Sequence, residues 1–161
     1  MRKAIRLTVL ALITLVIAAC ASAPRRSATL YDELGGRDGI AALVDGFLNR
    51  VADDYRIIDA FSGANIARLR RLLEEQFCAV SAGPCRYTGE SMEESHRGMG
   101  LRESEFNALV EDLIDAMEEL DIRVPVQNRL LAKLAPMHGD IMGKNQDPQR
   151  QRPGRLAADA P

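Results

Sequence analysis

The sequence predicts an all-α domain, on three observations. Apolar residues recur at helical spacing in four segments, near residues 40–51, 66–80, 106–120 and 126–141. No segment alternates between apolar and polar residues for long enough to form a convincing strand. Glycines and prolines stand between the segments, where helices commonly end. We therefore expect four main helices with short pieces between them.

The two N-terminal helices are predicted by their apolar faces and by the glycines beside them. Gly35-Gly36 separates a short first helix from the first long one, and Gly83-Pro84 ends the second long helix. One such face per helix is what a core-facing helix shows. The inward positions are Ile40, Leu43, Val44, Phe47, Leu48 and Val51, and then Ile66, Leu69, Leu73, Phe77 and Val80.

The third and fourth long helices have equally regular faces. Gly98 and Gly100 precede the third, and Pro125 stands where the fourth can begin, because a first-turn residue needs no N–H partner. Pro136 lies late in the fourth helix and should kink it or end its regular part. The inward positions are Phe106, Leu109, Val110, Leu113, Ile114, Met117 and Leu120, and then Val126, Leu130, Leu131, Leu134 and Ile141.

Both ends of the chain are predicted to lie outside the folded domain. Residues 1–19 combine a basic start, a short apolar run and small residues, which is typical of a secretory signal peptide. Residues 144–161 are polar, contain three prolines and lack apolar periodicity, so we expect a disordered tail. One folded domain over residues 30–143 remains.

The signal sequence ends in Ile-Ala-Ala-Cys20, which resembles the lipobox of bacterial lipoproteins. The resemblance implies cleavage before Cys20, a diacylglyceryl group on its thiol, and a tether over residues 20–29. An ordinary signal peptide with a nearby cysteine is the alternative. Ser22, and not an aspartate, stands second after the cysteine. By resemblance to enterobacterial sorting, this implies the periplasmic face of the outer membrane.

Export would place Cys78 and Cys85 in a compartment where disulfides persist. The two cysteines are seven residues apart across a Gly-Pro break, so the chain can fold back and bring them within disulfide range. Two reduced core thiols are the alternative. Loss of the signal also removes three basic residues and takes the formal net charge from −2 to −5. An acidic chain disfavours a nucleic-acid partner.

One of the two histidines lies in a segment suited to holding a ligand. His96 stands between Gly89 and Gly98, in a stretch long enough for about two helical turns, with Met92 on the same face. Such a segment can aim an imidazole, although a surface or capping histidine would fit the same pattern. His138, near the end of the last helix, is predicted to be a surface residue.

Taken together, these motifs resemble the group 1 truncated haemoglobins. The resemblance begins at the LYDELGG run of residues 30–36, continues through the segments around Phe61, Tyr87 and His96, and covers all of residues 30–143. It implies an all-α, two-over-two helical sandwich around haem b.

The resemblance assigns a role to each residue of the expected haem site. His96 becomes the proximal ligand of the iron, with its other ring N–H donating to a carbonyl or a carboxylate. Phe61 is expected to pack flat on the porphyrin, and Tyr87 to lie near the haem edge. The remaining wall residues are expected to be Phe47, Phe77, Met92, Leu101, Phe106 and Val110.

Leu48, Leu69 and Leu73 are expected to face the open coordination position, and here the chain departs from the family pattern. Many group 1 members have a tyrosine where Leu48 stands and a glutamine where Leu73 stands, and both donate hydrogen bonds to O₂. Leucine cannot donate, so we expect CO or NO to be favoured over O₂ relative to the family. Residues that a shifted alignment would bring inward as donors are Gln76, Asn49 and Tyr55.

The sequence thus predicts a haem protein that binds O₂, NO or CO. An NO dioxygenase or a peroxidase on the same haem is the first alternative. The leucines disfavour both, because dioxygenation needs O₂ held in place and peroxidase chemistry usually wants a polar acid–base group. An unidentified reductase is a candidate partner. The second alternative is a cofactor-free helical lipoprotein that serves as an interaction module.

Overall fold

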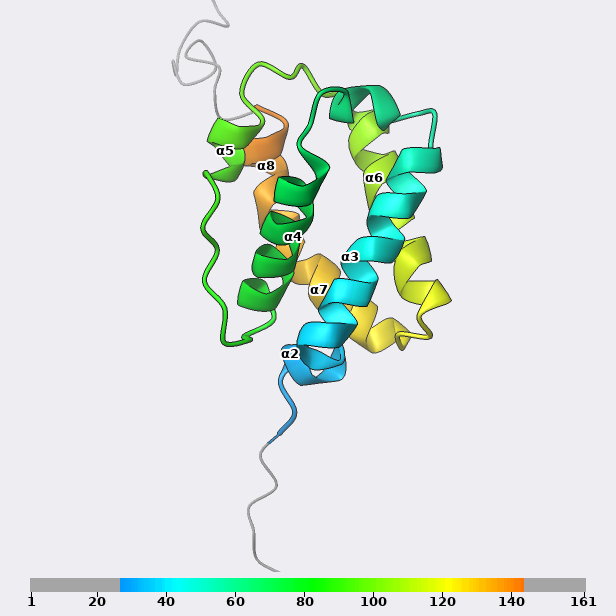
Figure 1. The fold of residues 1–161 in the computed structure, drawn as a ribbon, viewed down its shortest axis with the longest axis vertical. Helices are drawn as coiled ribbons and strands as arrows, with labels where there is room; N and C mark the ends of the chain where they lie inside the picture. Colours follow the sequence, from blue (N-terminus) through cyan, green and yellow to red (C-terminus); the bar gives the residue numbers. More distant parts are fainter. Residues whose placement is uncertain (1–26, 144–161) are drawn as a thin grey trace, which may run out of the picture.

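A computed structural model describes residues 27–143, which form helices joined by turns and loops and contain no strand (Figure 1). The all-α prediction is therefore confirmed. No helix within these residues has the length and apolar character needed to cross a membrane. The predicted signal peptide, the lipidation site at Cys20 and the polar tail lie outside the described residues.

Four long helices correspond to the four apolar faces seen in the sequence. They are α3 (Gly36–Asp53), α4 (Ile66–Val80), α6 (Glu103–Glu119) and α7 (Val124–Leu134). The shorter elements are single turns or 3₁₀ turns that join and orient the long helices. They are α2 (Leu30–Glu33), η1 (Ile58–Phe61), α5 (Met92–Ser95), η2 (Ala135–Met137) and α8 (His138–Ile141).

Polar caps explain where three of the helices begin. Thr29 and Asp32 form a capping box at the start of α2, and Ser91 and Glu94 form another at the start of α5. The side chain of Asn65 accepts a hydrogen bond from the first turn of α4. Because a helix of one turn is unstable alone, α2 and α5 depend on these caps together with their packing against other helices.

Pro136 ends the regular part of the last helix, as predicted. The α-helical pattern stops at Leu134, continues as the 3₁₀ turn η2, and resumes as α8. After this 3₁₀ interruption, α8 lies against α5 (Figure 1). The C-terminal turn therefore lies beside the segment that carries His96.

The sealed core lies where α3 packs against α4 and α6, with α7 closing one side. Leu43, Val44, Ala116, Met117 and Leu130 are all fully buried at 0% exposure. Burying one large apolar side chain contributes about 1.5–3 kcal/mol. This part of the domain therefore needs no other molecule to cover its apolar residues.

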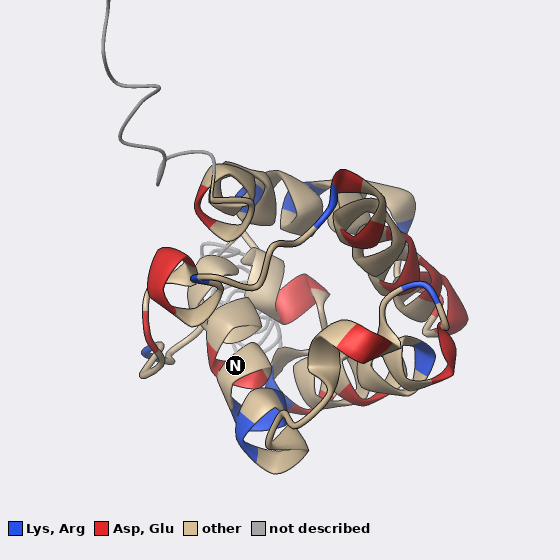
Figure 2. Cartoon of the chain, turned by 90° about the horizontal axis from the view of Figure 1, so that it is seen from above, with Lys and Arg blue, Asp and Glu red and all other residues tan. Residues whose placement is uncertain are grey.

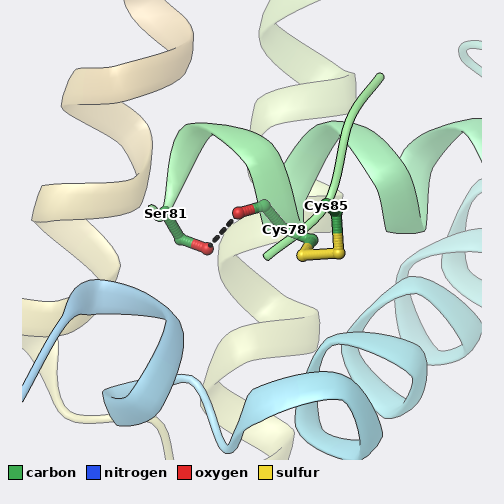
Figure 3. The surroundings of a disulfide bond; sticks show 3 residues. All are labelled: Cys78, Ser81 and Cys85. Atoms are coloured by element: carbon green, nitrogen blue, oxygen red, sulfur yellow. Dashed lines mark hydrogen bonds between the residues drawn. A yellow bond between two sulfur atoms is a disulfide. The ribbon is translucent and has the colours of Figure 1, made fainter. Parts of the chain in front are cut away.

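A disulfide joins the end of α4 to the loop that follows it (Figure 3). The Cα atoms of Cys78 and Cys85 are 5.7 Å apart. Beside them, Ser81 donates its hydroxyl to the carbonyl of Cys78 at 3.1 Å, and its own carbonyl accepts the backbone N–H of Tyr31 at 3.0 Å. A Cβ on Gly83 would lie 2.6 Å from the Cys78 sulfur, so only glycine fits this turn.

Two arginines, in the last turns of α3 and just after it, reach across to α6. Arg50 pairs with Asp115 at 3.0 Å, and Arg56 pairs with Glu111 at 2.6 Å. Figure 2 shows that acidic positions recur on several helices, with basic positions spread among them. Because exposed pairs contribute only about 0–1 kcal/mol each, these contacts orient the two helices more than they hold them.

Asp112, in the middle of α6, is a buried carboxyl with an incomplete set of partners. The residue is 5% exposed, and its Oδ2 has no hydrogen-bond partner among the described residues. Burial raises the pKa of Asp112, and the nearby Asp54 carboxylate raises it further, while Arg56 and Arg50 act in the opposite direction. Both arginines are already paired with other carboxylates.

We expect Asp112→Asn to stabilise the apoprotein at neutral pH. Because the pKa of Asp112 is raised above its ordinary 3.8, the folded state binds this proton more tightly than the unfolded state. The ionised Asp112 carboxylate therefore destabilises the folded state. This effect is absent below pH 3.8 and fully present once the pH has risen through the folded-state pKa. The expected gain at neutral pH is about 1 kcal/mol, the low end for an unsatisfied buried group. Urea unfolding of both proteins across this range measures it, and a gain that does not grow with pH would contradict the assignment.

Candidate functional site

His96 follows the single turn of α5, and hydrogen bonds fix the orientation of its ring. Its Nδ1 lies 2.8 Å from the carbonyl oxygen of Met92 and 3.0 Å from the hydroxyl of Ser95. A carbonyl can only accept, so Nδ1 carries the proton and donates it to Met92. In the neutral imidazole, this leaves Nε2 as the nitrogen with a free lone pair, which is the form that binds a metal ion.

The local sequence explains why the chain turns at His96. α5 has one turn, where the sequence predicted about two. Beyond it, Gly98 and Gly100 have φ angles of +76° and +64°, in the left-handed region that favours glycine. The chain therefore leaves the histidine through a bend and does not continue the helix.

Most of the apolar residues predicted for the site are half-buried, unlike the sealed core. They come from α3, η1, α4, α5, α6 and the loop before α6. Three of them, Leu48, Phe61 and Leu73, pack against the sealed core, and the others lie outside it. The half-buried apolar set comprises Leu48, Phe61, Leu69, Leu73, Met92, Leu101, Phe106 and Val110.

Phe47 and Phe77 behave differently from this set. They are 5% and 3% exposed and belong to the sealed core. Their role as walls of the pocket stays a prediction. Tyr87 is half-buried, its ring lies against Gly89, and burial raises the pKa of its hydroxyl.

The second histidine was predicted to be a surface residue, and the structure places it partly exposed, with its ring packed on a neighbouring helix. His138 begins α8, and its side chain is 30% exposed. Its ring meets that of Phe106 edge-on, with centroids 4.5 Å apart, and its Nε2 lies 3.1 Å from Glu103. Helical periodicity could not show this ring contact, because it places a residue on its own helix and not against a neighbouring one.

The three alternative distal donors all lie in other surroundings. Tyr55 is 87% exposed, and Asn49 is also exposed. Gln76 is half-buried and donates to the sulfur of Met137 at 3.3 Å. A shifted alignment is therefore not needed to account for these residues, and the three leucines remain the distal candidates.

A separate surface pocket of about 290 Å³ lies beside the disulfide. Its lining includes Arg37, Arg71, Glu74, Cys78 and Cys85. None of the residues predicted to line the haem belongs to it. The pocket and the His96 region are thus different places on the molecule.

The residues predicted for the site fit a haem on two grounds. One imidazole with a fixed tautomer is the protein ligand that globin iron takes. The half-buried apolar set is surface that the protein leaves partly uncovered, as an apolar cofactor site does. Fold and site together define a helical haem protein, and His96 stays the predicted ligand of the iron.

Comparisons with known proteins identify the family. The model of the family described as "Bacterial-like globin" matches residues 29–143, and the chain belongs to this family. A group 1 truncated haemoglobin of Mycolicibacterium paratuberculosis is 31% identical over 114 residues, which cover 71% of this chain and 84% of that relative. One from Tetrahymena thermophila is 28% identical and covers 74% and 99% of the two chains.

Solved structures agree with this assignment. Truncated haemoglobin from Tetrahymena pyriformis, in its Fe(III) form, superposes with a TM-score of 0.69 at 27% identity, over 71% of this chain and 98% of that one. A 2/2 haemoglobin from Synechococcus has a TM-score of 0.68 at 23% identity, which supports the fold. The two-over-two prediction is confirmed, and the chain is a haem-binding truncated globin.

Proposed function

We propose that this globin binds diatomic gases on a distal side lined by leucines, and that it favours CO and NO over O₂. The observation that supports this proposal is the trio of half-buried Leu48, Leu69 and Leu73 on α3 and α4. As a ligand, O₂ takes on partial negative charge and gains most from a hydrogen-bond donor. A bond to such a charged acceptor contributes about 1.5–3 kcal/mol, and leucine cannot supply it.

Each part of the site has a distinct task in this proposal. His96 would hold the iron through Nε2, while the Met92 carbonyl accepts the proton of the other ring nitrogen. When bound, haem supplies a ferrous iron with one open position for a diatomic ligand. The three leucines exclude water from that position without donating to the ligand. Keeping the iron ferrous outside the cytoplasm calls for an electron donor, so we propose a reductase partner.

Visible spectroscopy of the haem-loaded protein tests the proposal. We expect the ferrous spectrum to shift sharply with CO. O₂ should dissociate about ten-fold or more faster than from a group 1 relative that has the distal tyrosine and glutamine. Slow O₂ release, matching such a relative measured in parallel, would contradict the leucine proposal while leaving haem binding intact.

We also propose that the globin is held at the cell envelope by a lipid on Cys20, at the periplasmic face of the outer membrane. The Ile-Ala-Ala-Cys20 run and Ser22 support this placement. Mass spectrometry of the chain extracted from membranes should show an N-terminus at Cys20 with added diacylglyceryl. Cys20→Ala should release the protein from the membrane fraction. Recovery of an unmodified wild-type chain from the soluble fraction would contradict the anchor.

A further inference from the structure

We propose that residues 81–91 form a strap along α4 that positions His96, so that Cys85, Thr88 and Glu75 are positioning residues for the iron ligand. We call residues 81–91 the strap. The proposal rests on haem binding through His96. It concerns how this chain holds its histidine in place through Cys85, Thr88 and Glu75, which lie outside the haem-lining set.

The strap runs back along the helix that precedes it (Figure 1). α4 ends at Val80, and the strap then returns towards the start of α4 before α5 begins at Met92. Its first fixed point is the disulfide between Cys85 and Cys78. Three residues later along the strap, Thr88 contacts Glu75, which lies nearly one helical turn earlier on α4.

The second fixed point is a cluster of polar side chains. Glu75 Oε2 accepts the backbone N–H of Thr88 at 2.9 Å and its hydroxyl at 2.7 Å. Arg71 pairs with Glu75 and donates to the Thr88 hydroxyl oxygen at 3.0 Å. The hydrogen bond from Thr88 is the largest cause of the lowered pKa of Glu75, so the carboxylate stays charged as the pH falls through its usual range.

The strap leads into the N-terminal end of α5 and is itself fixed to α4. α5 is a single turn without a buried residue, and a turn of this length does not hold its own position. On its far side, residues 97–100 are all exposed and contain two glycines at positive φ. The one other element recorded in substantial contact with α5, within the described residues, is α8. The position of α5 is therefore set from two sides, by the strap that leads into it and by α8.

A short series of contacts carries this position to the imidazole. Two residues separate Thr88 from Ser91, which caps α5 through Glu94. The first residue of α5, Met92, offers the carbonyl that holds Nδ1 of His96 at 2.8 Å. A strap that slides along α4 would move this carbonyl and change the angle at which the imidazole meets the iron.

The experiment compares Cys85→Ser and Thr88→Val with wild type and with the matched control Glu74→Gln. Cys85→Ser breaks the disulfide, and Thr88→Val removes the hydroxyl while keeping the shape of the side chain. Glu74 lies near Arg70 at 3.5 Å, as Glu75 lies near Arg71, but it has no hydrogen bond to the strap among those recorded. The readouts are the ferrous iron–histidine stretching band, the rate of haem transfer to an acceptor globin, and hydrogen exchange of residues 84–96 in the apoprotein.

Both strap variants should show a shifted or broadened iron–histidine band, faster exchange in residues 84–96, and haem loss that is about ten-fold faster in Cys85→Ser. The control should match wild type. An unchanged band and unchanged exchange in Thr88→Val would overturn the proposal, even if Cys85→Ser fails to fold. If wild type shows no iron–histidine band at all, the result contradicts haem ligation by His96, and it can be told apart from a failure of the strap proposal.

Discussion

Replacing His96 with glycine should abolish the histidine-ligated haem spectrum. The Nε2 of this residue is the site's expected iron ligand, and its Nδ1 is already engaged with Met92. Without it, the apolar set can still shelter a porphyrin, but the iron loses its protein ligand. We expect the CO-bound band to be lost or strongly displaced, and haem to transfer to an acceptor globin at least ten-fold faster. Visible absorption of ferrous samples with and without CO measures both effects.

Added imidazole provides the control for this variant. The glycine leaves room for a free imidazole, so the spectrum should return towards wild type in proportion to its concentration. Far-UV circular dichroism of the apoprotein should stay helical, because His96 contributes nothing to the sealed core. A wild-type protein that folds but ignores haem would contradict the function itself, and the cofactor-free interaction module would take its place.

Introducing a donor at Leu48 should slow O₂ release more than any other single change in the distal set. Leu48 lies half-buried on α3 and packs against the core, so a tyrosine there has a fixed base from which its hydroxyl can reach the ligand. One hydrogen bond to a charged acceptor contributes about 1.5–3 kcal/mol, which corresponds to about ten-fold or more in O₂ retention. Stopped-flow displacement of O₂ by CO measures the rate.

Leu48→Phe is the matched control, since it adds the ring without the hydroxyl. We expect its O₂ release to stay fast while CO binding changes by a similar amount in both variants. Leu73→Gln with Leu73→Met offers the same comparison from α4. Equal O₂ release from Leu48→Tyr and Leu48→Phe would mean that this position does not face the ligand, and the assignment of the distal side would need revision.

Much of the fold could be predicted because it depends on periodicity. The faces built on residues such as Leu43, Met117 and Leu130 repeat at helical spacing, and these residues are fully buried. The end of the regular helix at Pro136 could also be predicted, since the loss of the proline's N–H hydrogen bond is a local effect. The packing of His138 on Phe106 could not, because it depends on the direction that the chain takes after that proline.

The site was less accessible to sequence reasoning alone. The glycines around His96 suggested a ligand-bearing turn, but its role came from the family resemblance. Asp112 was missed, although a signal existed: Ala108, Asp112 and Ala116 follow one another at four-residue intervals and are all buried. The contact between Glu75 and Thr88 could not have been found, because it depends on a loop that runs back along a helix.

The chain enters the domain at α2, at the end of the long axis opposite to α5 and α8 (Figure 1). An attachment before residue 27 would therefore join the domain at the end remote from the turn that bears the histidine. In such an arrangement, the body of the domain would lie between the entry of the chain and the turn that carries His96. Small molecules diffusing in from the surrounding water would reach that turn without passing along the supporting surface.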